Sequence, residues 1–340
     1  MQVYYTSPWV PPEWIKAHGL DPRGVWFADD LGAEPHPIGA GVCAFANSVV
    51  RFAERHADSA VVFSTHCDQL RRAFDTVGGS ALERRFLFNL PATWQSAAAR
   101  RLFISELERL GRFLVKLGGH TPSGEALAET MNQYGSARRQ LLEAATRVPA
   151  SAYAEAIARF HWDGSVNLPA PGQKNDGAVA VALLGGALPR AHWHVMDLIE
   201  SAGGRVVLNA SEAGERSLWY ATEDRPMPAA DASLPPLSAL PAATPEDLAR
   251  VCLDNCADVF QRPNTRLYAW LKPRLRSRQV RGIVLWHYVG CDLWRTEAQP
   301  LREAFDLPVL LLEATDTASE APRHAGRIQA FLESLRGPGA

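Results

Sequence analysis

The sequence lacks long uncharged apolar segments and a strong charge of either sign. No run approaches the roughly 18 uncharged apolar residues that suggest a membrane-spanning helix. Residues 1–14 lack the basic stretch followed by an apolar stretch that marks a secretory signal. The formal net charge is −2 and the basic residues are spread out, so neither nucleic acid nor a membrane is an expected partner. We therefore expect a cytoplasmic protein.

Cysteine is scarce, and its number is odd. The chain has five cysteines, at positions 43, 67, 252, 256 and 291. An odd count in a large chain without a secretory signal favours free thiols or metal ligands over a disulfide framework. The spacing matches no local metal motif such as C-x-x-C, and the sequence also has no G-x-G-x-x-G or P-loop motif. Metal or redox chemistry therefore stays open, and no nucleotide site is assigned.

What the sequence does contain is an alternation of apolar runs and helical patterns. With 340 residues, 47% of them hydrophobic, the chain is long enough for two cores. Residues 24–28, 60–65 and 85–91 resemble buried strands, and residues 43–57 show helical periodicity. This order predicts an α/β fold with a parallel sheet in the first part of the chain.

A helical section and a second α/β unit follow. Residues 96–161 are helical in pattern, with Ser123 as a helix N-cap. The Gly-, Pro- and Asn-rich stretch 163–177 is the best boundary. The second unit has expected strands at 178–186, 205–209, 281–287 and 307–315, and helices at 193–204, 297–305 and 323–335. The proline-rich stretch 223–245 is expected to be irregular, with Pro245 in the first turn of the helix that follows Thr244.

The predicted domains are 1–120, an N-terminal α/β domain; 121–165, a helical section; and 175–340, a C-terminal α/β domain. Cys67 and Cys291 each follow a predicted strand, once in each half, and ligand sites form where parallel strands end. Cys43 begins a helix, where amide donors and the helix dipole favour a thiolate. If the two halves face each other across a cleft, three thiolates meet at one soft metal centre.

Each cysteine also has a plainer interpretation. A single cysteine at a strand end is more often a small buried hydrophobe than a ligand. Cys252 and Cys256 lie on an apolar helical stripe, which explains them as core-facing residues of an amphipathic helix. The repeated context of Cys67 and Cys291 is what supports a metal site.

Several segments of the sequence resemble those of a known family. The chain resembles the 2-hydroxyacyl-CoA dehydratase D-component and benzoyl-CoA reductase family over nearly its whole length. The matching segments, in order, are SPWVPPEWIKAHGLDPRGV, Cys43 before a helix, THCDQLRR, ISELERLGRFL, MNQYGSARRQLL, LIESAGGRVV, GIVLWHYVGCD and LLLEATDTASEAPRHAGRIQAFLESL. The resemblance implies two Rossmann- or flavodoxin-like parallel-sheet domains with a helical section and a [4Fe-4S] cluster in the interdomain cleft.

The resemblance places the cluster ligands on Cys43, Cys67 and Cys291. It implies one subunit of an ATP-dependent low-potential reductase or dehydratase, which passes a single electron to an acyl-CoA thioester. The implied partners are a homologous second subunit, or a second copy of the chain, and an ATP-hydrolysing iron–sulfur activator. A cysteine that many relatives carry before a Pro-Asn segment is not clearly matched here. With five cysteines, the chain cannot supply six thiolates for a double-cubane centre.

The sequence offers further candidate site residues and two alternative functions. His66 and Glu297 are the candidate catalytic residues, and Asp316 is a further candidate beside the cluster. One rival is a non-catalytic, cluster-bearing electron-transfer or scaffold subunit. The other is a cluster-free α/β protein that uses Cys67 as a nucleophile or binds zinc.

Overall fold

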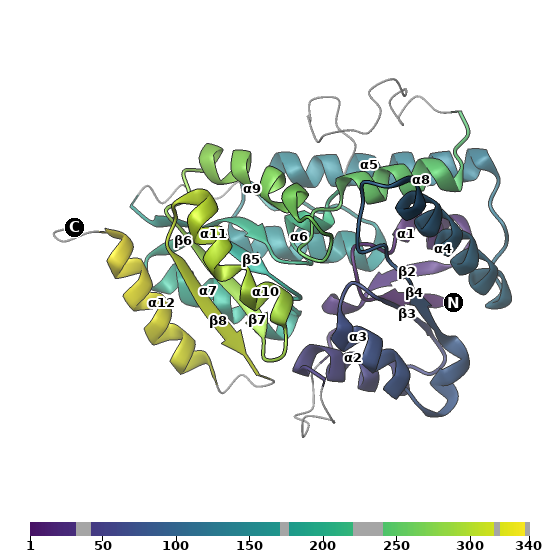
Figure 1. Ribbon diagram of the computed structural model, residues 1–340, viewed down its shortest axis with the longest axis horizontal. Helices are drawn as coiled ribbons and strands as arrows, with labels where there is room; N and C mark the ends of the chain where they lie inside the picture. The colour runs from purple at the N-terminus through teal and green to yellow at the C-terminus, as the bar shows by residue number, and fades with distance from the viewer. Residues whose placement is uncertain (32–41, 171–176, 220–240, 316–319, 337–340) are drawn as a thin grey trace.

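The chain folds around two parallel four-stranded sheets (Figure 1). The computed structural model describes residues 1–31, 42–170, 177–219, 241–315 and 320–336. The first sheet has the order β2-β1-β3-β4, formed by Asp21–Gly24, Gln2–Tyr5, Ala60–Ser64 and Arg85–Phe88. The second has the order β6-β5-β7-β8, formed by Gly204–Ala210, Val179–Gly185, Gly282–Tyr288 and Val309–Ala314. Both sheets therefore have the same topology, that of the first four strands of a flavodoxin-like fold.

Helices cover and connect the two sheets. In the first half they are α1 (Pro12–Ala17), α2 (Ala44–Arg55), α3 (Asp68–Thr76) and α4 (Ala97–Lys116). The helical section consists of α5 (Gly124–Ala144) and α6 (Ala150–Asp163). The second half has α7 (His194–Ser201), α8 (Pro245–Asn255), α9 (Thr265–Ser277), α10 (Asp292–Thr296), α11 (Ala298–Phe305) and α12 (Ala321–Arg336).

The two halves are packed together rather than connected by a single linker. Helix α6 contacts β2 of the first sheet and β6 of the second, and α8 lies against α4 (Figure 1). At one junction the buried His161 ring lies between two residues. One is Tyr5, the last residue of β1, and the other is Ser217. Its Nδ1 is 2.7 Å from the Tyr5 hydroxyl and its Nε2 is 2.7 Å from the Ser217 hydroxyl. Elements from both halves thus share one polar contact within the core.

The structure confirms the α/β class with a helical section. Ser123 caps α5 by accepting a hydrogen bond from the Ala126 amide. Thr244 and Asp247 form a reciprocal capping box on α8, with Pro245 in its first turn. The predicted boundary stretch lies partly outside the described residues, and the proline-rich stretch lies largely outside them.

One predicted strand is wrong. Residues 24–28 do not form a strand: β2 ends at Gly24, and Val25–Phe27 is a 3₁₀ turn. All three residues of the turn are buried, and Trp26 and Phe27 pack against the His161 ring. A short buried apolar run carries no periodicity that separates a strand from a turn, so tertiary packing decides its conformation.

None of the described helices combines the length and apolar character needed to span a bilayer.

Candidate functional site

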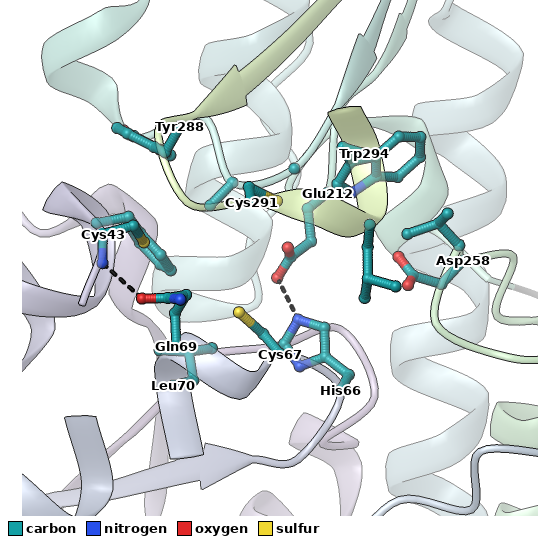
Figure 2. Close-up of a pocket in the computed structure, with 15 residues that line it drawn as sticks. Cys43, His66, Cys67, Gln69, Leu70, Glu212, Asp258, Tyr288, Cys291 and Trp294 are labelled. Atoms are coloured by element: carbon teal, nitrogen blue, oxygen red, sulfur yellow. Dashed lines mark hydrogen bonds and ion pairs between the residues drawn. The ribbon is translucent and has the colours of Figure 1, made fainter. Parts of the chain in front are cut away.

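Three cysteines from different parts of the chain line one pocket. Cys43, Cys67 and Cys291 face a common space between the two halves (Figure 2). Each is the N-cap residue of a helix, α2, α3 and α10 respectively. The carbonyl oxygen of each cysteine accepts the first hydrogen bond of its helix, at distances between 3.0 and 3.2 Å. Strand ends and helix starts therefore bring the three thiols together.

Burial dominates the acidity of these thiols. Cys43 is buried, and the other two are half-buried. Loss of solvation raises the pKa of Cys43 and raises the pKa of Cys291 to about 12. Burial, followed by the neighbouring Cys43 and Cys291 thiols, raises the pKa of Cys67 well above its ordinary value. The helix amides lower these values only in part, so the predicted preference for a thiolate at Cys43 is overridden by desolvation.

A histidine and a glutamate lie between the thiols. His66 Nε2 is 3.4 Å from Glu212 Oε1, and both side chains are buried. Figure 2 shows the Glu212 carboxylate in the space between Cys67 and Cys291, directed towards His66. Burial lowers the pKa of His66, but the Glu212 carboxylate outweighs that effect and the pKa is raised. The Glu212 carboxylate therefore favours the protonated form of His66 inside the pocket.

Glu212 Oε1 is poorly satisfied. A separation of 3.4 Å is long for a hydrogen bond. Among the described residues Oε1 has no hydrogen bond of acceptable geometry. His66, by contrast, has a second partner, because its Nδ1 lies 2.7 Å from the Ser64 hydroxyl. The pocket thus holds a buried carboxylate oxygen with spare capacity to accept a hydrogen bond.

A second buried ion pair supports the pocket wall. Asp258 lines the pocket, and its Oδ2 is 2.6 Å from Arg216 Nη1. The Arg216 guanidinium also donates to the carbonyl oxygens of Gly185, Ala210 and Ala257 at 2.6, 2.7 and 3.0 Å. It lies 4.6 Å from the ring centroid of Trp294, another lining residue. One side chain thereby joins the ends of β5 and β6 to the loop after α8 and to α10.

The rest of the wall is largely apolar. The apolar and aromatic lining residues are Phe45, Leu70, Val259, Leu293, Trp294 and Tyr288. Gln69 adds a polar contact, since its Oε1 accepts a hydrogen bond from the Cys43 amide at 2.7 Å. Such a lining limits the access of water to whatever the thiols bind.

The other predicted site residues have different positions. Glu297 does not line this pocket: its carboxylate is buried and accepts hydrogen bonds from Arg262, Asn264 and Tyr268. These hydrogen bonds satisfy the carboxylate. Glu297 therefore helps to hold the second half together and does not lie beside the thiols. Asp316 lies outside the described residues. Cys252 and Cys256 are fully buried in the hydrophobic core.

Sequence reasoning missed Glu212, Asp258 and Gln69. Glu212 follows β6, just as Cys67 follows β3 and Cys291 follows β7. The rule that sites form at the carboxyl ends of parallel strands was therefore sufficient to select Glu212. Asp258 and Gln69 carry no such signal, because each reaches the pocket only through the packing of its loop or helix.

The family of the chain follows from comparison with known sequences. The model of the family described as 2-hydroxyglutaryl-CoA dehydratase, D-component, matches residues 9–335. The chain belongs to this family. Members of the D-component family are typically subunits of dehydratase or reductase complexes, and they commonly bind an iron–sulfur cluster. A search of curated proteins finds no match.

The pocket has the donor chemistry that a cluster of the D-component family requires. Thiolates are the usual ligands of iron–sulfur clusters, and three of them leave one iron of a cubane open. Across the described ranges, no three His, Cys, Asp or Glu side chains are placed to hold a single metal ion. In a cubane each thiolate binds a different iron, so its ligands are spaced more widely than the ligands of one ion. Cys43, Cys67 and Cys291 supply the kind of donor atom that such a cluster uses, from one pocket.

Proposed function

We propose that this chain is a [4Fe-4S]-containing subunit of an ATP-dependent reductase or dehydratase acting on an acyl-CoA thioester. Its electrons come from an ATP-hydrolysing iron–sulfur activator, and it works beside a homologous subunit or a second copy of itself. When bound, the cluster supplies single low-potential electrons to the thioester. Cys43, Cys67 and Cys291 hold the cluster in this proposal, and they lose their protons as it binds.

The observation that carries the proposal is the convergence of these three cysteines from separate helix N-caps on one pocket. Family membership over residues 9–335 supports it independently. The remaining residues of the pocket suit the same chemistry. Apolar walls such as Phe45, Leu70 and Leu293 exclude water from the acyl group, and burial around the thiols strengthens electrostatic interactions with the substrate.

The test is anaerobic purification followed by iron and sulfide analysis and EPR of the reduced protein. We expect about four irons per chain, as a cubane requires. Cys67→Ala and Cys291→Ala are expected to lose the cluster, while Cys252→Ala, a matched change of a core thiol, retains it. A shift of the EPR signal on adding an acyl-CoA indicates that this subunit holds the substrate. An EPR signal that no acyl-CoA shifts favours the alternative function, a non-catalytic electron-transfer or scaffold subunit. An iron-free wild type prepared anaerobically with its partners would contradict the proposal.

A further inference from the structure

Two loops, one from each half, meet close to the pocket. The loop after β4 contains Trp94, and the loop after α8 contains Arg262 and Pro263. The Arg262 amide donates a hydrogen bond to the Ala92 carbonyl oxygen at 2.8 Å, and Trp94 Nε1 donates to the Pro263 carbonyl oxygen at 2.9 Å. The helices next to these loops, α4 and α8, also lie against each other (Figure 1). The two loops therefore form one junction between the halves.

This junction lies outside the space between the thiols but near it. Asp258 lines the pocket and belongs to the same loop as Arg262. Because a fully extended chain spans at most 3.6 Å per residue, the Cα atoms of these two residues are within about 14 Å of each other. Neither Trp94 nor Arg262 lines the pocket. A long ligand with one end in the pocket can therefore place its other end at the junction.

Trp94 offers a fixed aromatic surface at the junction. Its side chain is half-buried, and the adjacent Thr93 and Gln95 are exposed. The guanidinium of Arg266 lies 3.9 Å from the ring centroid of Trp94. Arg266 is itself 4% exposed and lies 3.3 Å from the Asp254 carboxylate, so it cannot move freely. A tryptophan ring held in this way is a platform on which a planar ligand can stack.

Positive charge is in excess around this ring. Arg100 and Arg266 share the Asp254 carboxylate, at 3.4 and 3.3 Å, and Arg262 lies 3.1 Å from Glu297. These five side chains carry three positive and two negative charges. The side chains of Arg100 and Arg262 are 32% and 47% exposed, so solvent and ligands can reach both. Partly exposed guanidinium groups are well suited to binding phosphate.

Arg262 can turn towards a ligand without leaving Glu297 unpaired. The Glu297 carboxylate also accepts hydrogen bonds from Asn264 at 2.8 Å and from Tyr268 at 2.6 Å. These two contacts remain when the Arg262 side chain moves. The energetic cost of recruiting Arg262 is therefore small compared with that of breaking a buried ion pair.

We propose that the junction binds the nucleotide end of an acyl-CoA, with the adenine stacked on Trp94 and a phosphate paired with Arg262. The pantetheine arm then leads the thioester towards the pocket. This inference rests on the proposed function, because it takes an acyl-CoA as the ligand. It adds to that function a separate binding site, built from one loop of each half, that explains how the two halves jointly hold the ligand.

Three probes test the proposal: CoA, adenosine 3′,5′-bisphosphate and ADP. The bisphosphate carries the adenine and the 3′-phosphate of CoA without the pantetheine arm, so its affinity reports the nucleotide site alone. ADP represents a free adenine nucleotide without a 3′-phosphate. Dissociation constants are measured by anaerobic titration calorimetry on the iron-loaded protein. We expect the wild type to bind the bisphosphate several-fold tighter than ADP.

Trp94→Ala should weaken the binding of CoA and of the bisphosphate about tenfold, because a stacked base is lost. Trp94→Phe keeps a ring but loses the hydrogen bond to Pro263, so affinities within about threefold of wild type separate stacking from support of the junction. Arg262→Gln should weaken both ligands about threefold to tenfold and reduce the salt dependence of binding. Trp162→Ala is the matched control, because Trp162 is also half-buried, lies 5.2 Å from Arg23 and does not line the pocket. It should behave as wild type.

The outcomes separate this site from the proposed function. Unchanged CoA affinity in Trp94→Ala would overturn the nucleotide site and leave the thioester function standing. Tighter binding of ADP than of the bisphosphate would do the same, since it assigns the site to a free adenine nucleotide. An iron-loaded wild type that binds neither CoA nor pentanoyl-CoA would overturn both. If Trp94→Ala fails to fold, Arg262→Gln decides the question.

Discussion

Cys67 and Cys291 occupy the same position relative to their two sheets, but different contacts hold the surrounding segments. Cys67 follows the end of β3 by three residues, and Cys291 follows the end of β7 by three residues, and both strands hold the third place in their sheet order. In the first half, Arg71, one of two arginines in the helix after the cysteine, is exposed and lies 3.3 Å from the exposed Asp68. In the second half, the buried Arg216 binds several elements to one another.

Topology thus selects where a ligand lies, whereas side-chain contacts decide how rigidly it is held. The connection in the second half also needs a special backbone conformation, because Gly290 before Cys291 has φ +85°. The connection in the first half has His66 at the equivalent place, without a positive φ.

Replacing Arg216 should have the largest effect on stability. Arg216→Met leaves the buried Asp258 without its partner, and breaking a buried ion pair in this way costs about 3–5 kcal/mol. The measurement is urea unfolding followed by tryptophan fluorescence. Arg216→Met combined with Asp258→Asn removes the orphaned charge and should recover part of the loss. If Arg216→Met alone were as stable as the wild type, the Arg216–Asp258 pair would not hold the second half together.

Acidification should weaken the junction of the two halves. Burial, followed by the charge of Arg138, lowers the pKa of His161 from 6.5 to about 3. Between these values the unfolded chain binds a proton that the folded chain excludes. Stability that is present above pH 6.5 is therefore lost as the pH falls. Lowering the pH from 7.5 to 5.0 should cost about 2 kcal/mol through this group.

The check is the pH dependence of the free energy of unfolding in the wild type and in His161→Gln. The variant should lack this part of the decline. His192, whose pKa burial and the nearby His194 lower to about 4, is present in both proteins, so its contribution cancels. Identical pH profiles for the two proteins would refute the assignment to His161.

Adding a methyl group at Gly290 should have a moderate effect. The nearest atom to an added Cβ is 3.8 Å away, on Gln69, so Gly290→Ala meets no steric obstacle. Its cost is conformational, about 1 kcal/mol, because an L-residue disfavours positive φ. Gly326→Ala, a change within α12 that also meets no atom within 4 Å, should instead stabilise the protein by about 0.5–1 kcal/mol. Thermal unfolding of both variants measures the contrast in sign.

Removing the exposed arginine of the first half should have the smallest effect. Arg71→Ala breaks a pair whose side chains are 58% and 87% exposed, and such pairs contribute less than about 0.5 kcal/mol. The urea midpoint should therefore stay close to that of the wild type. A loss as large as that of Arg216→Met would remove the difference between the two halves.

Much of the fold was accessible from the sequence, because its signals are local. Ser123 and Thr244 marked helix starts through side chains that cap the adjacent amides. The apolar runs at β3 and β7 were long enough to be recognised as buried strands. The N-terminal strand β1 escaped notice because Gln2–Tyr5 is short, and Val25–Phe27 was misassigned because a buried turn and a buried strand have similar composition.

For the site, the sequence by itself indicated that Cys67 and Cys291 follow predicted strands and that Cys43 begins a predicted helix. Only the tertiary structure decided which other residues surround these cysteines. It brought Glu212 and Asp258 to the same pocket and placed Glu297 among Arg262, Asn264 and Tyr268 instead. The reason is physical: strand and helix periodicities act over a few residues, whereas the approach of the two halves depends on how whole sheets and helices pack.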